Sequence, residues 1–260
     1  MRVNVNLSAA TDGAEPVVLR LASQIVTLLG ARPDGTHATL RPDLAALLEE
    51  ACLDDAPTAM TSALSCFRRF RVGPAALADI YIPDVARRLG QGWLDDRLGF
   101  AEVSNASARL QTLLRELNGR WVADDAETPD AGEILLVVPG GEQHTLGAMV
   151  AMGQLRRLGV SVCLRFGPTI AELVALMHAR RFDGVFISLS SPQKLGACRE
   201  LIVHLKSLGD GVPIILGGAV LTLCDDALAL SGADATTDDI RTALSRCGIV
   251  MDQQPALQSA

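Results

Sequence analysis

The stretch Ile134-Leu-Leu-Val-Val138, followed by Pro139-Gly-Gly-Glu-Gln-His-Thr-Leu-Gly147, decides the fold of this chain. Its unbroken apolar run is typical of a strand that is buried on both faces of a parallel sheet. A polar loop with two adjacent glycines comes next, and a helical pattern follows over residues 144–158. A buried strand, a glycine-containing loop and a helix in this order predict the beginning of a β-α-β unit.

Further short apolar runs repeat this arrangement through the second half of the chain. They lie at residues 160–164, 184–187, 213–216 and, more weakly, 233–236. Helical patterns separate and close them at residues 169–179, 193–208, 219–230 and 238–247. The alternation predicts a parallel sheet with right-handed crossovers. The resulting five strands and five helices suit the flavodoxin-like order, so the predicted class is a doubly wound α/β fold.

The first half of the chain contains no good strand pattern with a period of two. Helical patterns lie at residues 16–30, 43–52, 56–71, 74–90 and 100–121. They predict an all-α bundle of four or five helices. Residues 123–132 are acidic, contain a proline and a glycine and lack large apolar side chains, so they form the predicted linker. The expected domains are therefore 1–122 and 133–260.

Composition limits what the chain can do. Hydrophobic residues make up 49% of the 260 residues, which predicts a packed core, and no apolar run reaches transmembrane length. A formal charge of −7 disfavours direct DNA binding by the isolated chain, although it is compatible with a local basic patch. The six cysteines lack C-x-x-C and zinc spacing, and residues 1–13 lack a secretory pattern. We therefore expect a cytoplasmic protein.

Three unusual loops follow the first, third and fourth predicted strands. They are 139–147, Ser188-Leu-Ser-Ser-Pro192 and Gly217-Gly218. Ligands of open parallel sheets bind beyond the carboxyl ends of the strands, near the point where strand order reverses. Taken singly, the glycines are compatible with ordinary turns and the serines with helix caps. Their coincidence at one edge favours a site for a large flat ligand.

His144 has a carboxylate at a suitable spacing. A histidine that binds a metal usually donates its other N–H to a carboxylate, and Glu142 lies two residues earlier on the same loop. His178 and His204 fall within amphipathic helical patterns and are expected at the surface. The sequence supports no dinucleotide fingerprint, phosphate loop or Ser-His-Asp set, so we do not predict an enzyme.

The second half resembles the cobalamin-binding domains of the methionine synthase and light-sensing regulator type, whose signature is D-x-H-x-x-G, S-x-L and G-G. This chain has Glu142-x-His144-x-x-Gly147, then Ser188-x-Ser190, then Gly217-Gly218. The resemblance implies that His144 coordinates cobalt from below and that Glu142 accepts its hydrogen bond. It also implies that Ser188 and the glycine pair contact the nucleotide tail, while Gly147 and Ser190 complete the cofactor-binding set. Glutamate replaces the aspartate of the signature, and Ser190 replaces its leucine.

The string Trp93-Leu-Asp-Asp-Arg-Leu-Gly-Phe-Ala-Glu-Val103, with Arg109-Leu110, resembles the AerR/PpaA antirepressors of purple photosynthetic bacteria. Val103-Ser104 replaces the Glu-His pair found in many related cobalamin proteins. The resemblance implies that residues 1–122 cap a bound cobalamin, in the hydroxo or aquo form, with Trp93 over the corrin. It further implies a light- or redox-responsive regulator that controls a DNA-binding repressor of photosystem genes, of the CrtJ/PpsR type.

Other functions remain open at this point. Imidazole suits iron as well as cobalt, so a heme-binding sensor with the same architecture would use His144 in the same way. A corrinoid protein of a methyltransferase system would need a partner methyltransferase, and the missing Glu-His pair weakly disfavours it. A binding module without a cofactor is the fourth alternative.

Overall fold

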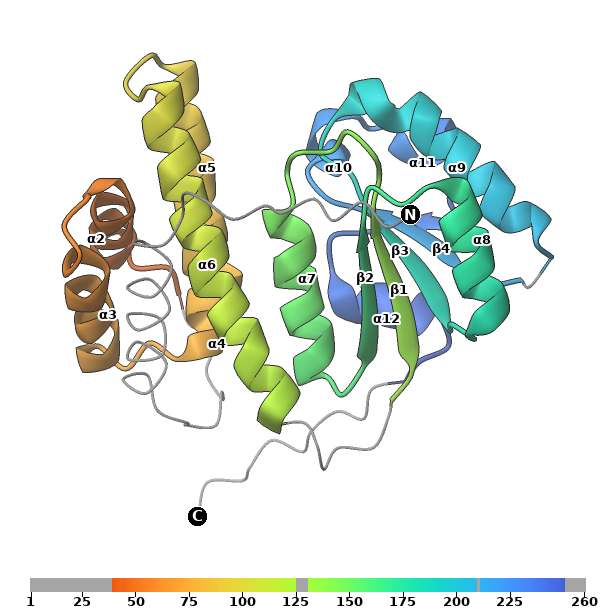
Figure 1. Ribbon diagram of the computed structural model, residues 1–260, viewed down its shortest axis with the longest axis horizontal. Coiled ribbons are helices and arrows are strands. Elements are labelled where there is room, and N and C mark those ends of the chain that lie inside the picture. The colour runs from red at the N-terminus through yellow and green to blue at the C-terminus, as the bar shows by residue number, and fades with distance from the viewer. Residues whose placement is uncertain (1–38, 125–130, 210, 251–260) are drawn as a thin grey trace, which may run out of the picture. The chain divides into compact units, whose positions relative to one another are not determined.

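The computed structural model describes residues 39–124, 131–209 and 211–250. These residues form two compact units, and the division between them falls after Leu117 (Figure 1). Most of the predicted linker, residues 125–130, lies outside the described residues, so the predicted domain limits stay a prediction. No helix in the described ranges combines the length and the apolar character that crossing a membrane requires.

The second unit is built on a parallel sheet of five strands. These are β1 (Glu133–Val138), β2 (Ser161–Phe166), β3 (Gly184–Ser188), β4 (Ile214–Gly217) and β5 (Ala235–Thr236). Their order in space is β2-β1-β3-β4-β5, which confirms the predicted flavodoxin-like, doubly wound α/β class. In the register of the sheet, Leu135 of β1 pairs with Cys163 on one side and with Val185 on the other. β1 and β3 therefore lie side by side in the sheet.

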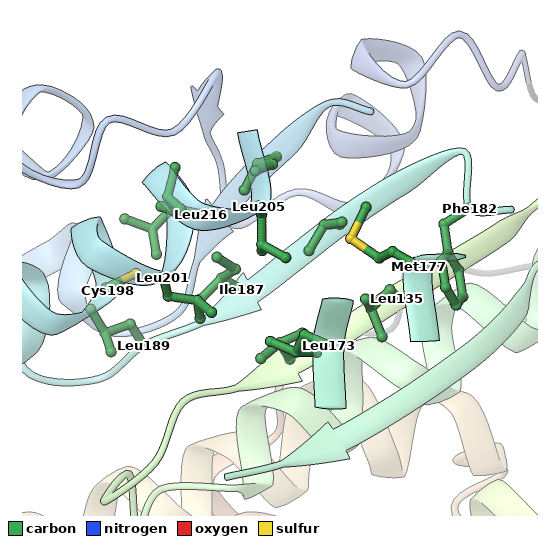
Figure 2. Packing of buried hydrophobic residues seen from close by; sticks show 14 of the residues in the cluster. Leu135, Leu173, Met177, Phe182, Ile187, Leu189, Cys198, Leu201, Leu205 and Leu216 are labelled. Atoms are coloured by element: carbon green, nitrogen blue, oxygen red, sulfur yellow. The ribbon is translucent and has the colours of Figure 1, made fainter. Parts of the chain in front are cut away.

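Helices cover both faces of this sheet, and alternate residues of β1 face each layer. Leu135 and Val137 pack in a cluster with α8 (Ile170–Ala179), α9 (Leu195–Ser207), α10 (Val220–Leu223) and α11 (Ala227–Ser231), part of which Figure 2 shows. Ile134, Leu136 and Val138 pack in a second cluster with α7 (Leu146–Arg157) and α12 (Ile240–Arg246). Burial on both faces explains the unbroken apolar run of β1.

The prediction of one helix at residues 219–230 is wrong in one respect, because the structure has two shorter helices there, α10 and α11. Cys224 between them has an extended backbone, with φ −150° and ψ 106°. Asp225 and Asp226 follow it, and aspartate has a low helix propensity because its side chain competes for backbone hydrogen bonds. Gly232, with a left-handed φ of 71°, ends α11. The apolar spacing alone did not reveal this interruption.

The first unit is helical over its described residues, as the sequence predicts. Its helices are α2 (Pro42–Leu53), α3 (Ala59–Arg69), α4 (Pro74–Ala76), α5 (Ile82–Leu94) and α6 (Phe100–Asp124), which continues past Leu117 into the second unit. The helix predicted at residues 16–30 lies outside the described residues. The predicted number of helices in the bundle therefore stays a prediction.

A wide helical turn, Leu77–Tyr81, joins α4 to α5. Ile82 N–H donates to the carbonyl of Leu77, five residues earlier, instead of four. Pro83 lies in the first turn of α5, and in a regular helix its ring would clash with the carbonyl four residues before it. The wider turn relieves this clash. The helix predicted at residues 74–90 is thus a series of three segments that extends to Leu94.

Candidate functional site

The loops after β1, β3 and β4 meet at the carboxyl edge of the sheet. Ser188, the last residue of β3, pairs with Gly217 of β4. Leu189 N–H then donates to the carbonyl of Gly217 at 3.0 Å, and Val220 N–H donates to the carbonyl of Leu189 at 3.1 Å. These bonds fix the loop that follows β3 next to the glycine pair. The loop that follows β1 reaches the same place through Glu142.

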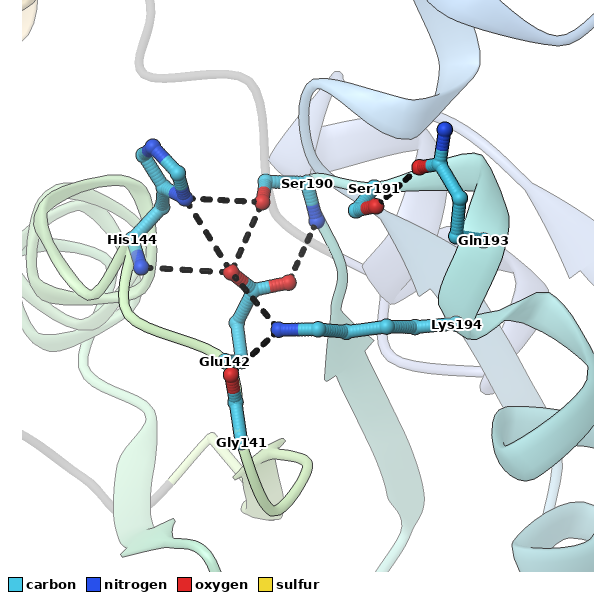
Figure 3. Close-up of polar contacts among 7 residues, drawn as sticks. All are labelled: Gly141, Glu142, His144, Ser190, Ser191, Gln193 and Lys194. Atoms are coloured by element: carbon cyan, nitrogen blue, oxygen red, sulfur yellow. Dashed lines mark hydrogen bonds and ion pairs between the residues drawn. The ribbon is translucent and has the colours of Figure 1, made fainter.

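Glu142 is the centre of the polar contacts in this site (Figure 3). Only 1% of its side chain is exposed. Ser190 N–H donates to Oε2 at 3.0 Å, and the Ser190 hydroxyl donates to Oε1 at 2.7 Å. His144 N–H also donates to Oε1, at 3.2 Å. The carboxylate therefore joins the loop after β1 to the loop after β3 in one defined orientation.

Two effects shift the pKa of Glu142 in opposite directions. Burial raises it, because a carboxylate loses hydration when it leaves water. Hydrogen bonds from Ser190 and His144 act in the opposite direction, since they stabilise the charged form. The bonds prevail and lower the pKa of Glu142 to about 2. The group is thus a carboxylate, which accepts hydrogen bonds only, at any pH near neutrality.

The imidazole of His144 is oriented by the same carboxylate. Its Nδ1 lies 3.2 Å from Oε1 of Glu142 and 3.0 Å from Oγ of Ser190. The hydroxyl hydrogen of Ser190 is already donated to Glu142, and a carboxylate can only accept, so Nδ1 must carry the proton that it shares with them. The lone pair of the neutral ring is then on Nε2, which is turned away from Glu142 and Ser190 in Figure 3. With 79% of the side chain exposed, Nε2 is available to a metal ion.

Lys194 belongs to this site, although the sequence patterns did not point to it. It lies in the short 3-10 helix η3 (Pro192–Lys194). Its Nζ is 3.7 Å from Oε1 of Glu142, and it donates to the carbonyl of Gly141. The one available signal was its place two residues after the loop that the switch-point rule selects. The partnership of Ser190 with Glu142 was also missed, since Ser190 was expected to contact the cofactor and not another side chain of the site.

Gly217 at the end of β4 and Gly218 directly after it have a structural role of their own. A Cβ added at Gly218 would lie 2.5 Å from the carbonyl oxygen of Leu189, and the φ of Gly218 is +99°. A Cβ at Gly217 would lie 2.9 Å from the carbonyl oxygen of Thr237. Both positions therefore require glycine for the backbone to pack as it does. The expected contacts of Ser188, Gly217 and Gly218 with a nucleotide tail stay a prediction.

The glycines on either side of His144 differ from Gly217 and Gly218, because they have open space around them. A Cβ added at Gly140, Gly141 or Gly147 would meet no atom within 4 Å. The backbone beside His144 is thus open, and a flat ligand can approach it closely. A single imidazole with an accessible Nε2 suits a metal whose remaining positions are filled by a macrocycle. The residues present therefore fit a tetrapyrrole cofactor.

Trp93 lies in the first unit, in the last turn of α5, and is 53% exposed. Leu94 and Phe100, at the adjoining ends of α5 and α6, are also exposed, at 73% and 76%. Large exposed apolar side chains that lie close together in the sequence are typical of a surface that binds a ligand or another protein. The expected role of Trp93 over a cofactor stays a prediction.

Known proteins are similar to both parts of the chain. Residues 132–245 match the family model described as the B12 binding domain. An "Uncharacterized 20.5 kDa protein in bchF-crtJ intergenic region" of Rhodobacter capsulatus is 40% identical over 185 residues, which cover 71% of this chain and 96% of that protein.

Among solved structures, the monomethylamine corrinoid protein of Methanosarcina barkeri aligns with a TM-score of 0.62 at 15% identity, covering 78% of this chain and 94% of that one. At this identity the likeness concerns the fold alone. The match to the B12 binding domain spans the Glu142, Ser190 and Gly218 loops described above. The chain therefore belongs to the family of the Rhodobacter capsulatus bchF-crtJ intergenic protein and contains a B12-binding domain.

Proposed function

We propose that this protein binds cobalamin and acts as a light- or redox-responsive regulator rather than an enzyme. It is an antirepressor in the cytoplasm that works on a DNA-binding repressor of photosystem genes, of the CrtJ/PpsR type. One observation carries the cofactor assignment. Glu142 and Ser190 hold the imidazole of His144 by Nδ1 and leave Nε2 free for cobalt.

Each residue of the site then has a role. His144 would hold the metal through Nε2, and Glu142 with Ser190 fixes its tautomer and orientation. Gly147 would leave room beside the ligand, and Ser188, Gly217 and Gly218 would contact the nucleotide tail. Trp93 would contribute an indole that excludes water from the cofactor. Bound cobalamin would supply a metal centre whose ligation responds to light or redox state.

The regulatory part of the proposal is supported by the setting of the Rhodobacter capsulatus relative. That protein is named for the bchF-crtJ intergenic region, and crtJ gives its name to the repressor type that the sequence resemblance implies. The charge of −7 fits a protein that acts by contacting a DNA-binding protein, since an acidic chain has little affinity for phosphates on its own.

Absorbance of the reconstituted protein tests the cofactor. The purified chain is mixed with hydroxocobalamin, desalted, and measured in the dark and after illumination; heme is tried in parallel. We expect a retained corrin spectrum that the variant His144→Ala alters or loses, while the surface variant His178→Ala keeps it. Retention of heme instead of cobalamin would favour a heme sensor, and an unchanged spectrum in His144→Ala would refute the axial ligand.

A gel-shift assay tests the regulator. A purified CrtJ/PpsR-type repressor is bound to a photosystem promoter fragment, and the cobalamin-loaded chain is added in the dark and in light. We expect the repressor–DNA complex to change only when the loaded chain is present, and the chain alone not to shift the fragment. No effect on the complex, together with cobalamin-dependent methyl transfer in a reconstituted assay, would favour a corrinoid carrier.

A further inference from the structure

Three exposed arginines and an exposed phenylalanine lie at the C-terminal end of helix α3 and directly after it. They are Arg68-Arg69-Phe70-Arg71, which we call the arginine–phenylalanine surface. In the described part of the chain, no carboxylate lies within ion-pair distance of these three arginines. Most other described arginines of the same unit are paired with carboxylates, for example Arg87 and Arg88 with Asp84. Three arginines within four residues, without a carboxylate partner among the described residues, are unusual in a chain whose net charge is −7.

Helix stability explains only part of this cluster. Positive side chains in the last turn interact favourably with the unsatisfied carbonyls at the helix C-terminus, and Arg68 and Arg69 occupy that turn. This reason does not extend to Arg71, which lies beyond the helix, or to Phe70, which is 45% exposed.

Arg71 occupies a backbone position that favours glycine. Its φ is 59°, in the left-handed region, where long side chains are disfavoured. Its N–H donates to the carbonyl of Arg68 at 3.0 Å, and Val72 N–H donates to the carbonyl of Phe67 at 3.0 Å. This pair of bonds is the Schellman motif, in which glycine is usual at the position of Arg71. An arginine kept in a disfavoured conformation points to a role for its side chain outside the fold.

Phe70 is held in place on the same surface. The guanidinium of Arg41 lies 4.1 Å from the centre of its ring, and Arg41 is itself paired with Asp43 at 2.6 Å. The stack fixes the ring, so that an incoming apolar group would meet it without a large loss of side-chain entropy.

We propose that the arginine–phenylalanine surface docks an acidic segment of a partner protein, which also presents an apolar side chain to Phe70. The charges are complementary, and arginine and aromatic residues are enriched in protein interfaces whereas lysine is depleted. DNA is a less suitable partner, because affinity for a duplex grows with the number of phosphates that are neutralised, about 6–10 in a strongly salt-dependent complex, and this surface offers three arginines. The proposal goes beyond the cofactor function and does not depend on it.

Fluorescence anisotropy of the full chain with a labelled, glutamate-rich peptide that contains one tryptophan tests the docking. We expect salt-sensitive binding that the double variant Arg68→Gln/Arg69→Gln weakens about fivefold or more. Arg87→Gln removes an exposed arginine elsewhere on the same unit and should leave the affinity unchanged.

Position 71 gives a second readout that a purely structural role would not produce. Arg71→Gly should raise the thermal midpoint by about 2–4 °C, because it relieves the left-handed backbone, and still weaken peptide binding. Arg71→Lys keeps the charge and the backbone strain, so both the midpoint and the binding should stay close to those of the wild type. A gain in stability combined with a loss of binding would identify a residue retained for docking.

Three results would overturn the proposal. One is peptide binding that is absent, or equal in the wild type and in the arginine variants. Another is tighter, arginine-dependent binding of duplex DNA in the same assay, which would make the surface a nucleic-acid site. The third is self-association in sedimentation velocity that the variants abolish, which would make it an interface between two copies of this chain.

Discussion

Asp84 in the first unit and Glu142 in the second are both buried carboxylates, and their surroundings balance the negative charge in different ways. Asp84 faces cations, since Arg88 donates to it at 2.6 Å and Arg87 lies at 3.3 Å. Glu142 faces neutral donors, namely the backbone and hydroxyl of Ser190 and the backbone and ring of His144, with one cation further away.

This difference in partners indicates a different role for each carboxylate. Arg88 also lies 3.7 Å from Glu49 of α2, so the charges around Asp84 tie α5 to a neighbouring helix. The donors around Glu142 come from two loops and end on an imidazole whose other nitrogen is exposed. Ion pairing in the first case ties two helices of the unit together, and hydrogen bonding in the second sets the direction of the proposed metal ligand, His144.

The largest effect on stability is expected for Asp84→Ala. Removing the carboxylate leaves the partly exposed Arg88 without its close partner, although Glu49 remains 3.7 Å away, and should lower the free energy of unfolding by about 2 kcal/mol. Urea denaturation measures the change, and cobalamin binding should be retained by the folded protein. Asp43→Ala, which breaks the exposed pair with Arg41, is the matched control and should cost under about 1 kcal/mol. Equal losses in the free energy of unfolding for the two variants would show that the pairs of Asp84 contribute no more than an exposed ion pair.

Next in size is the effect of Glu142→Gln on cofactor affinity. The amide keeps the shape of the side chain, but one of its two terminal atoms can only donate, so a bond from Ser190 or His144 is lost. We expect the affinity for cobalamin to fall by about 10- to 100-fold. Loss of the hydrogen-bond partner of a metal-binding histidine commonly has an effect of this size. Equilibrium titration measures it. An affinity within about twofold of the wild type would mean that Glu142 does not orient the ligand.

The same carboxylate makes stability depend on pH. The pKa of Glu142 is about 2 in the folded protein, below its ordinary value of 4.5, so its ionised form stabilises the fold. That contribution is complete above the ordinary value and is lost as the pH falls toward about 2. Urea midpoints of the wild type should therefore fall between about pH 5 and about pH 3 more steeply than those of Glu142→Gln. Parallel curves would contradict the assignment.

The sequence predicts the fold better than it predicts this network, for a physical reason. Strand and helix patterns are local, so the buried run at β1 and the alternation after it identify the α/β class. The pairing of Glu142 with His144 is also local, since only one residue separates them. Ser190 and Lys194 come close to Glu142 only because β1 and β3 pair in a particular register. No pattern of spacing along the sequence predicts these contacts. The break at Cys224 depends on backbone geometry that apolar spacing does not record.

A smaller effect is expected for Ser190→Ala. It removes the hydroxyl that bonds Glu142 but keeps the backbone N–H on Oε2, so we expect a loss of about 1 kcal/mol in stability. The ring of His144 should also be less restricted. Urea denaturation and the cobalamin titration measure the two effects, and Ser191→Ala, one residue away and without a contact to Glu142 in the described structure, is the control.

The smallest effect is expected for Lys194→Met. Its ammonium group lies 3.7 Å from Glu142 and is partly exposed, so the ion pair should contribute about 0.5 kcal/mol. We expect a slight loss of stability that disappears at high salt, because salt screens this charge pair. A loss as large as that of Glu142→Gln in cobalamin affinity would mean that the neutral donors are not the main determinant of the site.

The proposed bond between Nε2 of His144 and cobalt can be observed directly. Electron paramagnetic resonance of the protein loaded with cob(II)alamin tests it, with the chain produced once with natural histidine and once with histidine whose ring nitrogens are ¹⁵N. If His144 binds cobalt, the superhyperfine triplet from ¹⁴N becomes a doublet in the labelled protein, and this doublet is lost in His144→Ala but kept in His178→Ala. A triplet that labelling leaves unchanged would show that the nitrogen on cobalt comes from the cofactor, and would contradict the claim.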